Sequence, residues 1–495
     1  MSAETDVLDS DVVVTTTVGV TGHLWRSAVS VWGAVTPWGE TTEQTLDWAI
    51  AADDRWHVPA EEPAVRQQRI DGTPVLETRV RIPDGDAVQR VWSVADRGGL
   101  TVIEIENDSP LPFAVAFFGR DVLTERTPTD NPIQGIDLPA GAITLPVAHH
   151  TSIRVAIPHV SIPAGLDPHG VSLSGLASAD AVARGWTMLT NRASRVDLPD
   201  VGLASALTAA RCDLLLEGPT DAEIDPVGFV LDVGELVRCG DDAEPWLIEV
   251  VAPLESVARG DDPQLAAAVG AAARVALAAG DDRAAKDIAK LYERIVRRNI
   301  ASELGPFSEL VRGPSVGRFV AAVEQRLANG GDLLPIGLPA AWLGANFELH
   351  GVPTSPTSTV SLAVRWHGDR PAALWEQTGS PCQLTASAVD ADWASDLVSG
   401  EALWARPRSV RSTSLALGVD TAPVVTAPMD TAPVVTAPLD TALVDTALVD
   451  TALVDTALVD TALVDTALVD TAPQGEVGTE PTPPVIDDSD STSFS

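Results

Sequence analysis

The stretch from Asp71 to Ile82 is DGTPVLETRVRI, a turn signal followed by a strand pattern. Asp-Gly favours a tight hairpin turn because both positions tolerate positive φ angles. From Leu76 to Ile82 every second residue is apolar or threonine and the residues between them are charged, which is typical of a half-buried strand. Residues 65–70 supply the partner strand. We therefore predict an antiparallel hairpin over residues 65–82.

Further strand patterns follow this hairpin, with glycine and proline between them. They cover residues 88–94, 100–106, 112–118, 142–147 and 152–157. Short strands at regular spacing with tight turns favour an antiparallel β-sandwich. Residues 1–60 show no regular period but are rich in tryptophan.

From Ser178 the spacing of apolar residues becomes helical. Seven helices are expected, at residues 178–190, 202–217, 226–239, 245–259, 263–279, 281–298 and 316–328. Three of them have a proline in the expected first turn, where it costs no hydrogen bond, and three have a glycine just past the end. These residues are Pro226, Pro245, Pro263, Gly240, Gly260 and Gly280. Short loops between the helices favour antiparallel helical hairpins.

The strand period returns after Pro356. Residues 359–366 and 372–376 predict a hairpin with its turn at 367–370, and residues 382–388 and 400–404 are further strand candidates. The predicted fold class is thus α+β. It comprises an N-terminal antiparallel β-sandwich (1–175), a helical-hairpin middle domain that is a partial α/α toroid or bundle (176–340), a small closing C-terminal β-sheet (341–408) and a disordered tail (409–495).

The tail is an acidic low-complexity segment. Threonine recurs every five residues from Thr421 to Thr471, and six copies of Thr-Ala-Leu-Val-Asp end the array. A period of five keeps apolar residues on one face of neither a helix nor a strand, so a disordered spacer is favoured. A square β-helix of pentapeptide repeats is the alternative. The tail is also a candidate docking segment for a protein partner.

Charge and cysteine content narrow the classes of partner and cofactor. A formal net charge of −38 disfavours nucleic acid and anionic membranes as partners. The three cysteines are far apart and form no CxxC pair, so neither a zinc site nor a disulfide framework is expected. The N-terminus lacks the order of a signal peptide, and no apolar run reaches about 18 residues, the length of a membrane span. We expect a cytoplasmic protein without a metal or cofactor.

One cluster of residues near position 50 resembles a sugar-binding or acid–base site. Two carboxylates, an imidazole and indole rings are the groups that such a site uses. The candidate catalytic residues are Asp53, Asp54 and His57, and the candidate ligand contacts are Trp48, Arg55 and Trp56. The favoured alternative is a loop held by Asp–Arg and Asp–His hydrogen bonds beside a buried tryptophan.

A second cluster lies in the last third of the chain. Glu348 is a further candidate catalytic residue, and His350, Arg365 and His367 are candidate ligand contacts. On a strand Arg365 and His367 share one face, and Trp366 occupies the other. Trp366 and Trp375 are expected to anchor the sheet on the helices.

Other candidates carry weaker signals. His149, His150, His159 and His169 fit no standard set of metal ligands. Neither a P-loop, a dinucleotide-binding glycine fingerprint nor Gly-x-Ser-x-Gly is present. The helical section contains Asp213, Glu217, Asp221, Glu235 and Glu249, but no acid–base pair stands out among them, and Glu235 and Glu249 are expected on solvated helix faces or at caps.

The order of sandwich, helical hairpins and closing sheet resembles the layout of six-hairpin, toroid-type glycosidases. More narrowly, four stretches are similar to an actinobacterial family without an assigned reaction: residues 46–59, Val102–Asn107, Gly234–Arg238 and Arg365–Gly368. The resemblance implies a fold rather than an activity. Seven helices are fewer than a full toroid uses, which places catalysis by opposed carboxylates in doubt.

Two hypotheses about function follow. The first is a non-enzymatic interaction or scaffold protein built on a glycosidase-like layout, which predicts no concave pocket with convergent polar groups. The second is a carbohydrate-binding or glycoside hydrolase-like protein with a cleft between the sandwich and the helical domain. As an inverting hydrolase it would hold two carboxyl groups roughly 6.5–9.5 Å apart.

Overall fold

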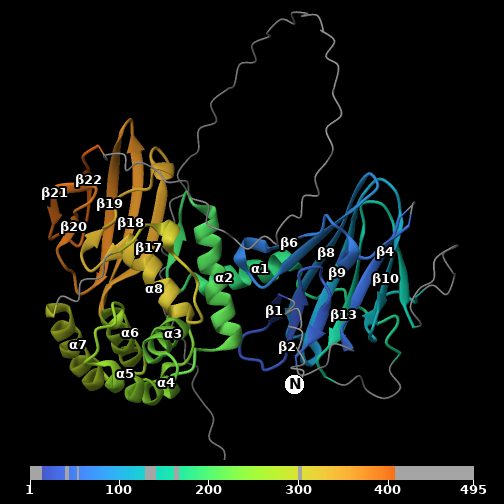
Figure 1. The fold of residues 1–495 in the computed structure, drawn as a ribbon, viewed down its shortest axis with the longest axis horizontal. Coiled ribbons are helices and arrows are strands. Elements are labelled where there is room, and N and C mark those ends of the chain that lie inside the picture. The colour runs from blue at the N-terminus through green and yellow to red at the C-terminus, as the bar shows by residue number, and fades with distance from the viewer. Residues whose placement is uncertain are drawn as a thin grey trace, which may run out of the picture. The chain divides into compact units, whose positions relative to one another are not determined.

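The computed structural model describes residues 14–38, 44–52, 55–128, 141–160, 167–298 and 304–406. These residues form eight α-helices and five β-sheets and fall within the compact unit Met1–Pro423 (Figure 1). The prediction of a mixed α+β chain is confirmed. The boundaries predicted for separate domains stay a prediction, and the pentapeptide tail lies outside the described residues.

Residues 14–160 form three antiparallel sheets. Their strand orders are β1-β2-β3, β12-β10-β4-β5 and β11-β13-β9-β8-β7-β6. The strands are β1 (Thr15–Gly19), β2 (Arg26–Ser30), β3 (Val35–Pro37), β4 (Asp47–Ala51), β5 (Trp56–His57), β6 (Arg66–Arg69), β7 (Leu76–Ile82), β8 (Gly85–Val94), β9 (Leu100–Asp108), β10 (Phe113–Phe118), β11 (Leu123–Thr124), β12 (Ile143–Val147) and β13 (Ser152–Pro158).

The hairpin that the Asp-Gly pair predicts is present. Strands β6 and β7 pair antiparallel, with Arg66 opposite Arg79 and Arg69 opposite Leu76. Asp71 and Gly72 both have positive φ angles, 50° and 73°, within a short 3₁₀ turn. An Asp-Gly pair enters this conformation at little cost, and it reverses the chain between the two strands.

One hydrophobic core joins the four- and six-stranded sheets. It packs Ile50 and Val115 of the first with Val91, Ile103 and Val155 of the second, and all five are fully buried. The expectation of an irregular segment over residues 1–60 is wrong, because strands β1 to β5 lie there. Each of these strands is five residues or shorter, too short for a two-residue period to stand out.

The eight α-helices lie between residues 179 and 327. They are α1 (Ala179–Thr190), α2 (Val201–Glu217), α3 (Pro226–Cys239), α4 (Ala243–Glu249), α5 (Val251–Val257), α6 (Leu265–Ala278), α7 (Asp282–Arg297) and α8 (Val316–Leu327). Helix α3 begins as predicted, with Asp225 accepting a hydrogen bond from Gly228 N and Pro226 in the first turn. It ends at Gly240, whose φ is 110°.

Two details of the helical prediction are wrong. The helix expected over residues 245–259 is two short helices, α4 and α5, which meet at Val250. Pro263 precedes α6 instead of lying in its first turn, whereas Pro245 lies in the first turn of α4 as predicted, as the third residue after the cap Asp242. The N–H groups of a first turn have no partner within the helix, so proline is tolerated at any position of that turn. A proline therefore does not identify the exact residue at which a helix begins.

Glycines let α3 approach two neighbouring helices closely. A Cβ on Gly234 would lie 2.6 Å from Ala271 Cβ on α6, and a Cβ on Gly317 of α8 would lie 2.3 Å from the carbonyl carbon of Leu231 on α3. Both distances are shorter than any normal contact. The glycines therefore fix the spacing of α3, α6 and α8.

Replacing Gly234 by alanine is expected to lower the free energy of unfolding by about 1–3 kcal/mol, because the added methyl forces α3 and α6 apart. Gly185 on α1 is the matched control, since a Cβ there meets nothing within 4 Å. Alanine at Gly185 should instead stabilise by about 0.5–1 kcal/mol through helix propensity. Urea unfolding followed by circular dichroism measures both, and equal effects at the two positions would contradict the packing argument.

The remaining strands form two more sheets, ordered β14-β17-β18-β19-β22 and β15-β16-β20-β21. The predicted hairpin is present: β18 and β19 pair antiparallel and Gly368 in the turn has a φ of 64°. The strands are β14 (Arg195–Asp197), β15 (Ala328–Asn329), β16 (Asp332–Leu333), β17 (Phe347–Ser355), β18 (Ser358–His367), β19 (Arg370–Gly379), β20 (Leu384–Ala386), β21 (Asp390–Ser395) and β22 (Ser399–Leu403).

Helices α2 and α8 share a core with the five-stranded sheet. Leu207 of α2 and Val323 of α8 belong to the same buried cluster as Leu349 and Leu362 of the sheet. Trp375 is 6% exposed and Trp366 is partly buried against the same core, which agrees with the expected anchoring role. This packing places one face of α8 against the sheet and leaves another face for α3.

Candidate functional site

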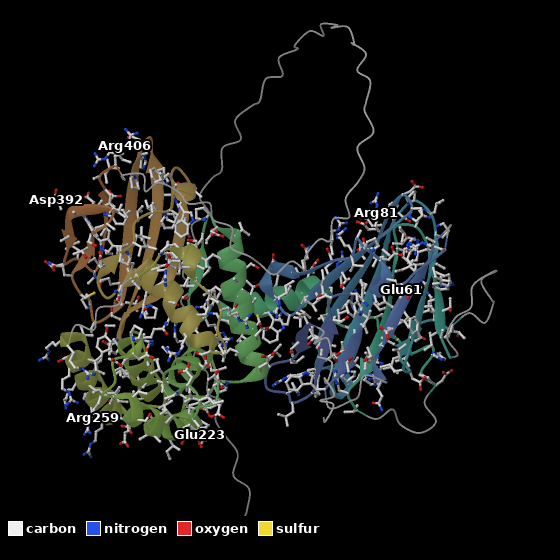
Figure 2. All side chains as sticks on the ribbon, in the orientation of Figure 1. Glu61, Arg81, Glu223, Arg259, Asp392 and Arg406 are labelled. Carbon is white, nitrogen blue, oxygen red and sulfur yellow. The ribbon has the colours of Figure 1, made fainter. Side chains whose placement is uncertain are left out.

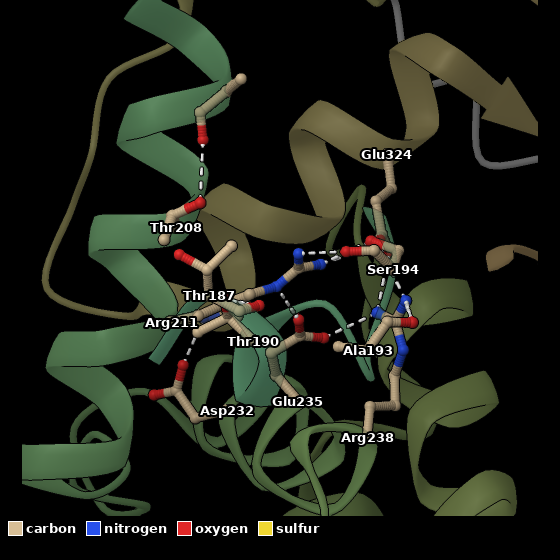
Figure 3. A network of polar contacts seen from close by, with 12 residues as sticks. Thr187, Thr190, Ala193, Ser194, Thr208, Arg211, Asp232, Glu235, Arg238 and Glu324 are labelled. Carbon is tan, nitrogen blue, oxygen red and sulfur yellow. Dashed lines mark hydrogen bonds and ion pairs between the residues drawn. The ribbon is translucent and has the colours of Figure 1, made fainter. Parts of the chain in front are cut away.

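Four charged side chains and a serine form a buried network where α2, α3 and α8 meet (Figure 3). Arg211 of α2 donates to Glu235 of α3 at 2.6 Å and lies 3.3 Å from Glu324 of α8. Arg238 of α3 donates to Glu235 at 2.6 Å and to Glu324 at 2.8 Å. Ser194 Oγ donates to Glu324 at 2.7 Å. Two arginines are thus matched by two carboxylates.

Backbone carbonyls complete the hydrogen bonding of both guanidinium groups. Arg211 Nη1 donates to Ser194 O and Arg238 Nη2 donates to Ala193 O, each at 2.7 Å. The side chains are between 3% and 11% exposed. By contrast, charged residues such as Glu223 and Arg259 lie at the surface (Figure 2). Buried charges need this degree of pairing, because an unpaired charge in a protein interior is costly.

The two arginines favour the ionised form of Glu235. Burial alone would raise the pKa of Glu235, but the charges of Arg238 and Arg211 hold that pKa below its usual range. Burial likewise opposes the charge of Arg238, yet Glu235 and Glu324 raise its pKa above the usual value. A carboxyl group with a lowered pKa is a poor general acid at neutral pH.

A pocket of about 100 Å³ opens beside this network. Its walls come from α3, α6, α7, α8 and β17. Small residues on α6 leave the space open, among them Ala266, Ala267, Gly270 and Ala271. The polar residues of the wall are Glu235, Arg238, Arg274, Tyr292, Glu324, Gln325, Asn329, Thr354 and Ser355.

Arg274 of α6 is the charged group of this pocket that the network does not neutralise. None of the ion pairs formed among the described residues includes it, and its Nη1 donates to Ser355 O over 3.4 Å. Its Nε is buried and has no hydrogen-bond partner. Burial, followed by the like charge of Arg238, lowers the pKa of Arg274 to about 10. The guanidinium still carries its full charge at neutral pH.

Three neutral side chains of the same wall have no hydrogen-bond partner among the described residues. They are Tyr292 of α7, Gln325 of α8 and Asn329, which is exposed on β15. Thr354 and Ser355 are engaged, with Ser358 Oγ and Thr357 N respectively. Polar groups that converge on a small pocket without protein partners are the hallmark of a ligand site.

The first predicted cluster is only partly described. Asp53 and Asp54 lie outside the described residues. His57 Nδ1 lies 3.0 Å from Glu62 Oε1, and Arg55 pairs with the same oxygen at 2.6 Å. Glu62, which the sequence prediction missed, is therefore a shared partner of both side chains.

The tryptophans of the first cluster lie mainly against protein. Trp48 is 2% exposed and donates its indole N–H to Trp32 O at 3.0 Å. To stack on a ligand, Trp48 would have to leave the core. Trp56 is partly buried on β5, which pairs with β4.

The structure does bring the second predicted cluster together. Glu348 and His350 lie on β17 and Arg365 on the adjacent strand β18, and Arg365 donates to Glu348. His350 Nε2 lies 3.0 Å from Glu348 and 2.6 Å from Arg195 Nη2. Hydrogen bonds from His350 and Arg365 lower the pKa of Glu348. These side chains are a quarter to a half exposed and do not line the pocket, and His367 is exposed at the end of β18.

The network and pocket residues were largely missed from sequence. Glu235 was expected on a solvated helix face or at a cap, which is wrong, because it is 3% exposed. One signal was available: Arg274 is the single charged residue between Asp262 and Asp281, in an Ala-rich helix that is apolar on all sides. Such a charge must either have a buried partner or face a cavity.

No three His, Cys, Asp or Glu side chains of the described residues lie together so that they could hold a metal ion. His159 contacts Thr101 at 2.8 Å and stacks on Trp25, and burial lowers its pKa to about 4. Within the described segments, no helix combines the length and apolar character needed to cross a bilayer.

No family model matches the chain, and neither a curated protein nor a solved structure matches it significantly. The pocket beside the Arg211–Glu235–Arg238–Glu324 network is therefore the feature of the described residues that bears on function.

Proposed function

We propose that this protein is a non-enzymatic binding protein for a small polar molecule, held in the pocket between α3, α6, α8 and β17. This pocket departs from the interaction or scaffold hypothesis, which predicted no concave pocket with convergent polar groups. The observation that carries the proposal is one cavity lined by Arg274, whose buried Nε has no hydrogen-bond partner, and by Tyr292 and Gln325, whose side chains form no hydrogen bond among the described residues. Leaving polar groups unpaired and partly desolvated costs free energy, which a bound ligand would recover.

The bonding of the two carboxylates in the wall disfavours glycoside hydrolysis. Both Glu235 and Glu324 accept hydrogen bonds from two arginines. A glycosidase needs one protonated carboxyl group and one free carboxylate. The lowered pKa of Glu235 makes it a poor acid, and Glu324 is not a free carboxylate because it is bonded to the same two arginines, which supports binding rather than glycoside hydrolysis at this pocket. The similarity to six-hairpin glycosidases and a carbohydrate ligand both stay proposals, and the experiment below includes sugars for that reason.

Thermal shift of the full chain against a panel of small acids, amides, amines, polyols and sugars tests the proposal. A compound at about 100 times its Kd should add about 2.7 kcal/mol of stability and raise the melting temperature by a few degrees. Incubation with the same sugars and their glycosides should give no product. A panel without any shift, or turnover of a glycoside, would refute the proposal.

Replacing Ala267 by methionine is expected to abolish the shift, because the longer side chain fills the pocket that Ala267 lines. Ala278 on the same helix is the matched control, since it is exposed and does not line the pocket. Methionine at Ala278 should leave the ligand-induced shift unchanged. Equal loss at both positions would place the ligand elsewhere.

A further inference from the structure

We infer that the ligand of this pocket is a short monocarboxylate whose carboxylate is bound by the Arg274 guanidinium. The inference rests on the proposed function and adds the chemical class of the ligand. It stands on three features of the described residues: the charge balance of the network and the pocket wall, the unused hydrogen-bonding capacity of Arg274 and the size of the cavity.

The charge balance favours a single negative charge. The pocket wall holds Arg238, Arg274, Glu235 and Glu324. Arg211 lies outside the wall but also pairs with both glutamates, so the three arginines outnumber the two carboxylates by one positive charge. A monoanion neutralises that surplus. A dianion such as phosphate would exceed the single surplus positive charge, and the two carboxylates of the wall would repel it. A cationic ligand would face Arg274 directly.

The donors of Arg274 match a carboxylate in geometry. A guanidinium offers a planar fork of N–H groups, which binds a carboxylate through two parallel hydrogen bonds. On Arg274 the Nε–H is buried without a partner, and the acceptor at Ser355 O lies 3.4 Å from Nη1, at the long end of hydrogen bonding. Arg274 therefore retains unused hydrogen-bonding capacity in the wall of the pocket.

The size and remaining lining limit the rest of the ligand. A cavity of about 100 Å³ accommodates a molecule of only a few non-hydrogen atoms. Alanine and glycine of α6 give it a small apolar wall, and Tyr292, Gln325 and Asn329 offer hydrogen bonds to a hydroxyl or carbonyl. A two- to four-carbon acid with or without a hydroxyl group meets these conditions.

Isothermal titration of the full chain with acetate, propionate, glycolate and lactate tests the inference. Acetamide and propionamide are the comparison compounds, because they have the same shape without the charge. We expect at least one acid to bind about ten- to a hundredfold more tightly than its amide, the range expected for charge-assisted hydrogen bonds. Equal binding of acid and amide would overturn the inference while leaving the proposed function intact.

Arg274→Met provides the matched variant. It should weaken acid binding about ten- to a hundredfold and leave amide binding unchanged. The variant should melt at or above the temperature of the unliganded wild-type protein, because the lowered pKa shows that burial and Arg238 oppose the charge of Arg274 in the folded state. Arg274→Lys, which keeps the charge without the fork, should bind with intermediate affinity.

Each remaining outcome decides between the two proposals. Acid binding that Arg274→Met does not weaken would overturn the inference and place the carboxylate elsewhere. Phosphate or sulfate binding more tightly than every acid would also overturn it, in favour of an inorganic anion. If neutral polyols or sugars bind and the acids do not, the binding function stands and the carboxylate inference fails. If no compound binds, both fail.

Discussion

Replacing Glu324 by leucine is expected to lower the free energy of unfolding by about 3–5 kcal/mol, the loss typical when one partner of a buried ion pair is removed. Glu324 is 6% exposed and accepts hydrogen bonds from Ser194, Arg211 and Arg238. Without it, Glu235 alone would oppose both buried guanidinium groups. Chemical denaturation at pH 7 measures the loss.

The control for this prediction is an exposed pair of the same chemistry. Glu293 accepts from Arg297 at 2.9 Å on α7, and both side chains are more than half exposed. Leucine at Glu293 should change stability by no more than about 0.5 kcal/mol, because surface pairs at i,i+4 spacing contribute little. A loss below about 1 kcal/mol for Glu324→Leu would mean that solvent screens the network.

The regular parts of this fold could be predicted because their signals are local. The Asp71-Gly72 turn and the alternation after Leu76 locate a hairpin without knowledge of the rest of the chain. Helix α3 is bounded by Asp225 and Gly240. Each caps the helix through hydrogen bonds to backbone groups only a few residues away in the sequence. Such signals depend on nearby residues only, and so the sequence contains them completely.

The pocket could not be predicted because its signals are long-range. Glu235 and Glu324 are 89 positions apart and meet through Arg211 and Arg238. Their approach depends on close packing at Gly234 and Gly317, which a sequence does not distinguish from glycines at an ordinary turn. The proximity of Glu348 and His350 could be predicted from sequence, since strand alternation places residues i and i+2 on one face.

The same helix junction supports the other large expected effect. Asp232 of α3 is 1% exposed and accepts three hydrogen bonds: from Thr220 N at 2.9 Å, from Ser315 Oγ at 3.0 Å and from Gly317 N. Ser315 is the N-cap of α8, and Gly317 lies in the first turn of that helix, where N–H groups lack partners within the helix. One carboxylate thus ties the start of α8 to α3.

Replacing Asp232 by alanine is therefore expected to lower the free energy of unfolding by about 2–4 kcal/mol, because the buried N–H of Gly317, the part-buried N–H of Thr220 and the Ser315 hydroxyl lose a charged acceptor together. An ordinary cap is the control. Ser178 caps α1 through one hydrogen bond to Ala181 N, and alanine there should cost about 1 kcal/mol. Equal losses at Asp232 and Ser178 would show that Asp232 acts as a cap and no more.

Asp232→Asn separates the charge from the shape. Burial raises the pKa of Asp232, although hydrogen bonds from Thr220 N, Gly317 N and Ser315 oppose the increase. The folded protein then binds this proton more tightly than the unfolded chain, whose carboxyl has the ordinary value of 3.8. As pH falls from 7 towards 3.8, the free energy of unfolding of the protein with Asp232 should rise through this protonation. The asparagine variant lacks this gain because asparagine does not titrate. The deficit of Asp232→Asn should therefore increase on acidification, and a deficit that shrinks instead would mean that the hydrogen bonds outweigh burial and hold the pKa below its usual range.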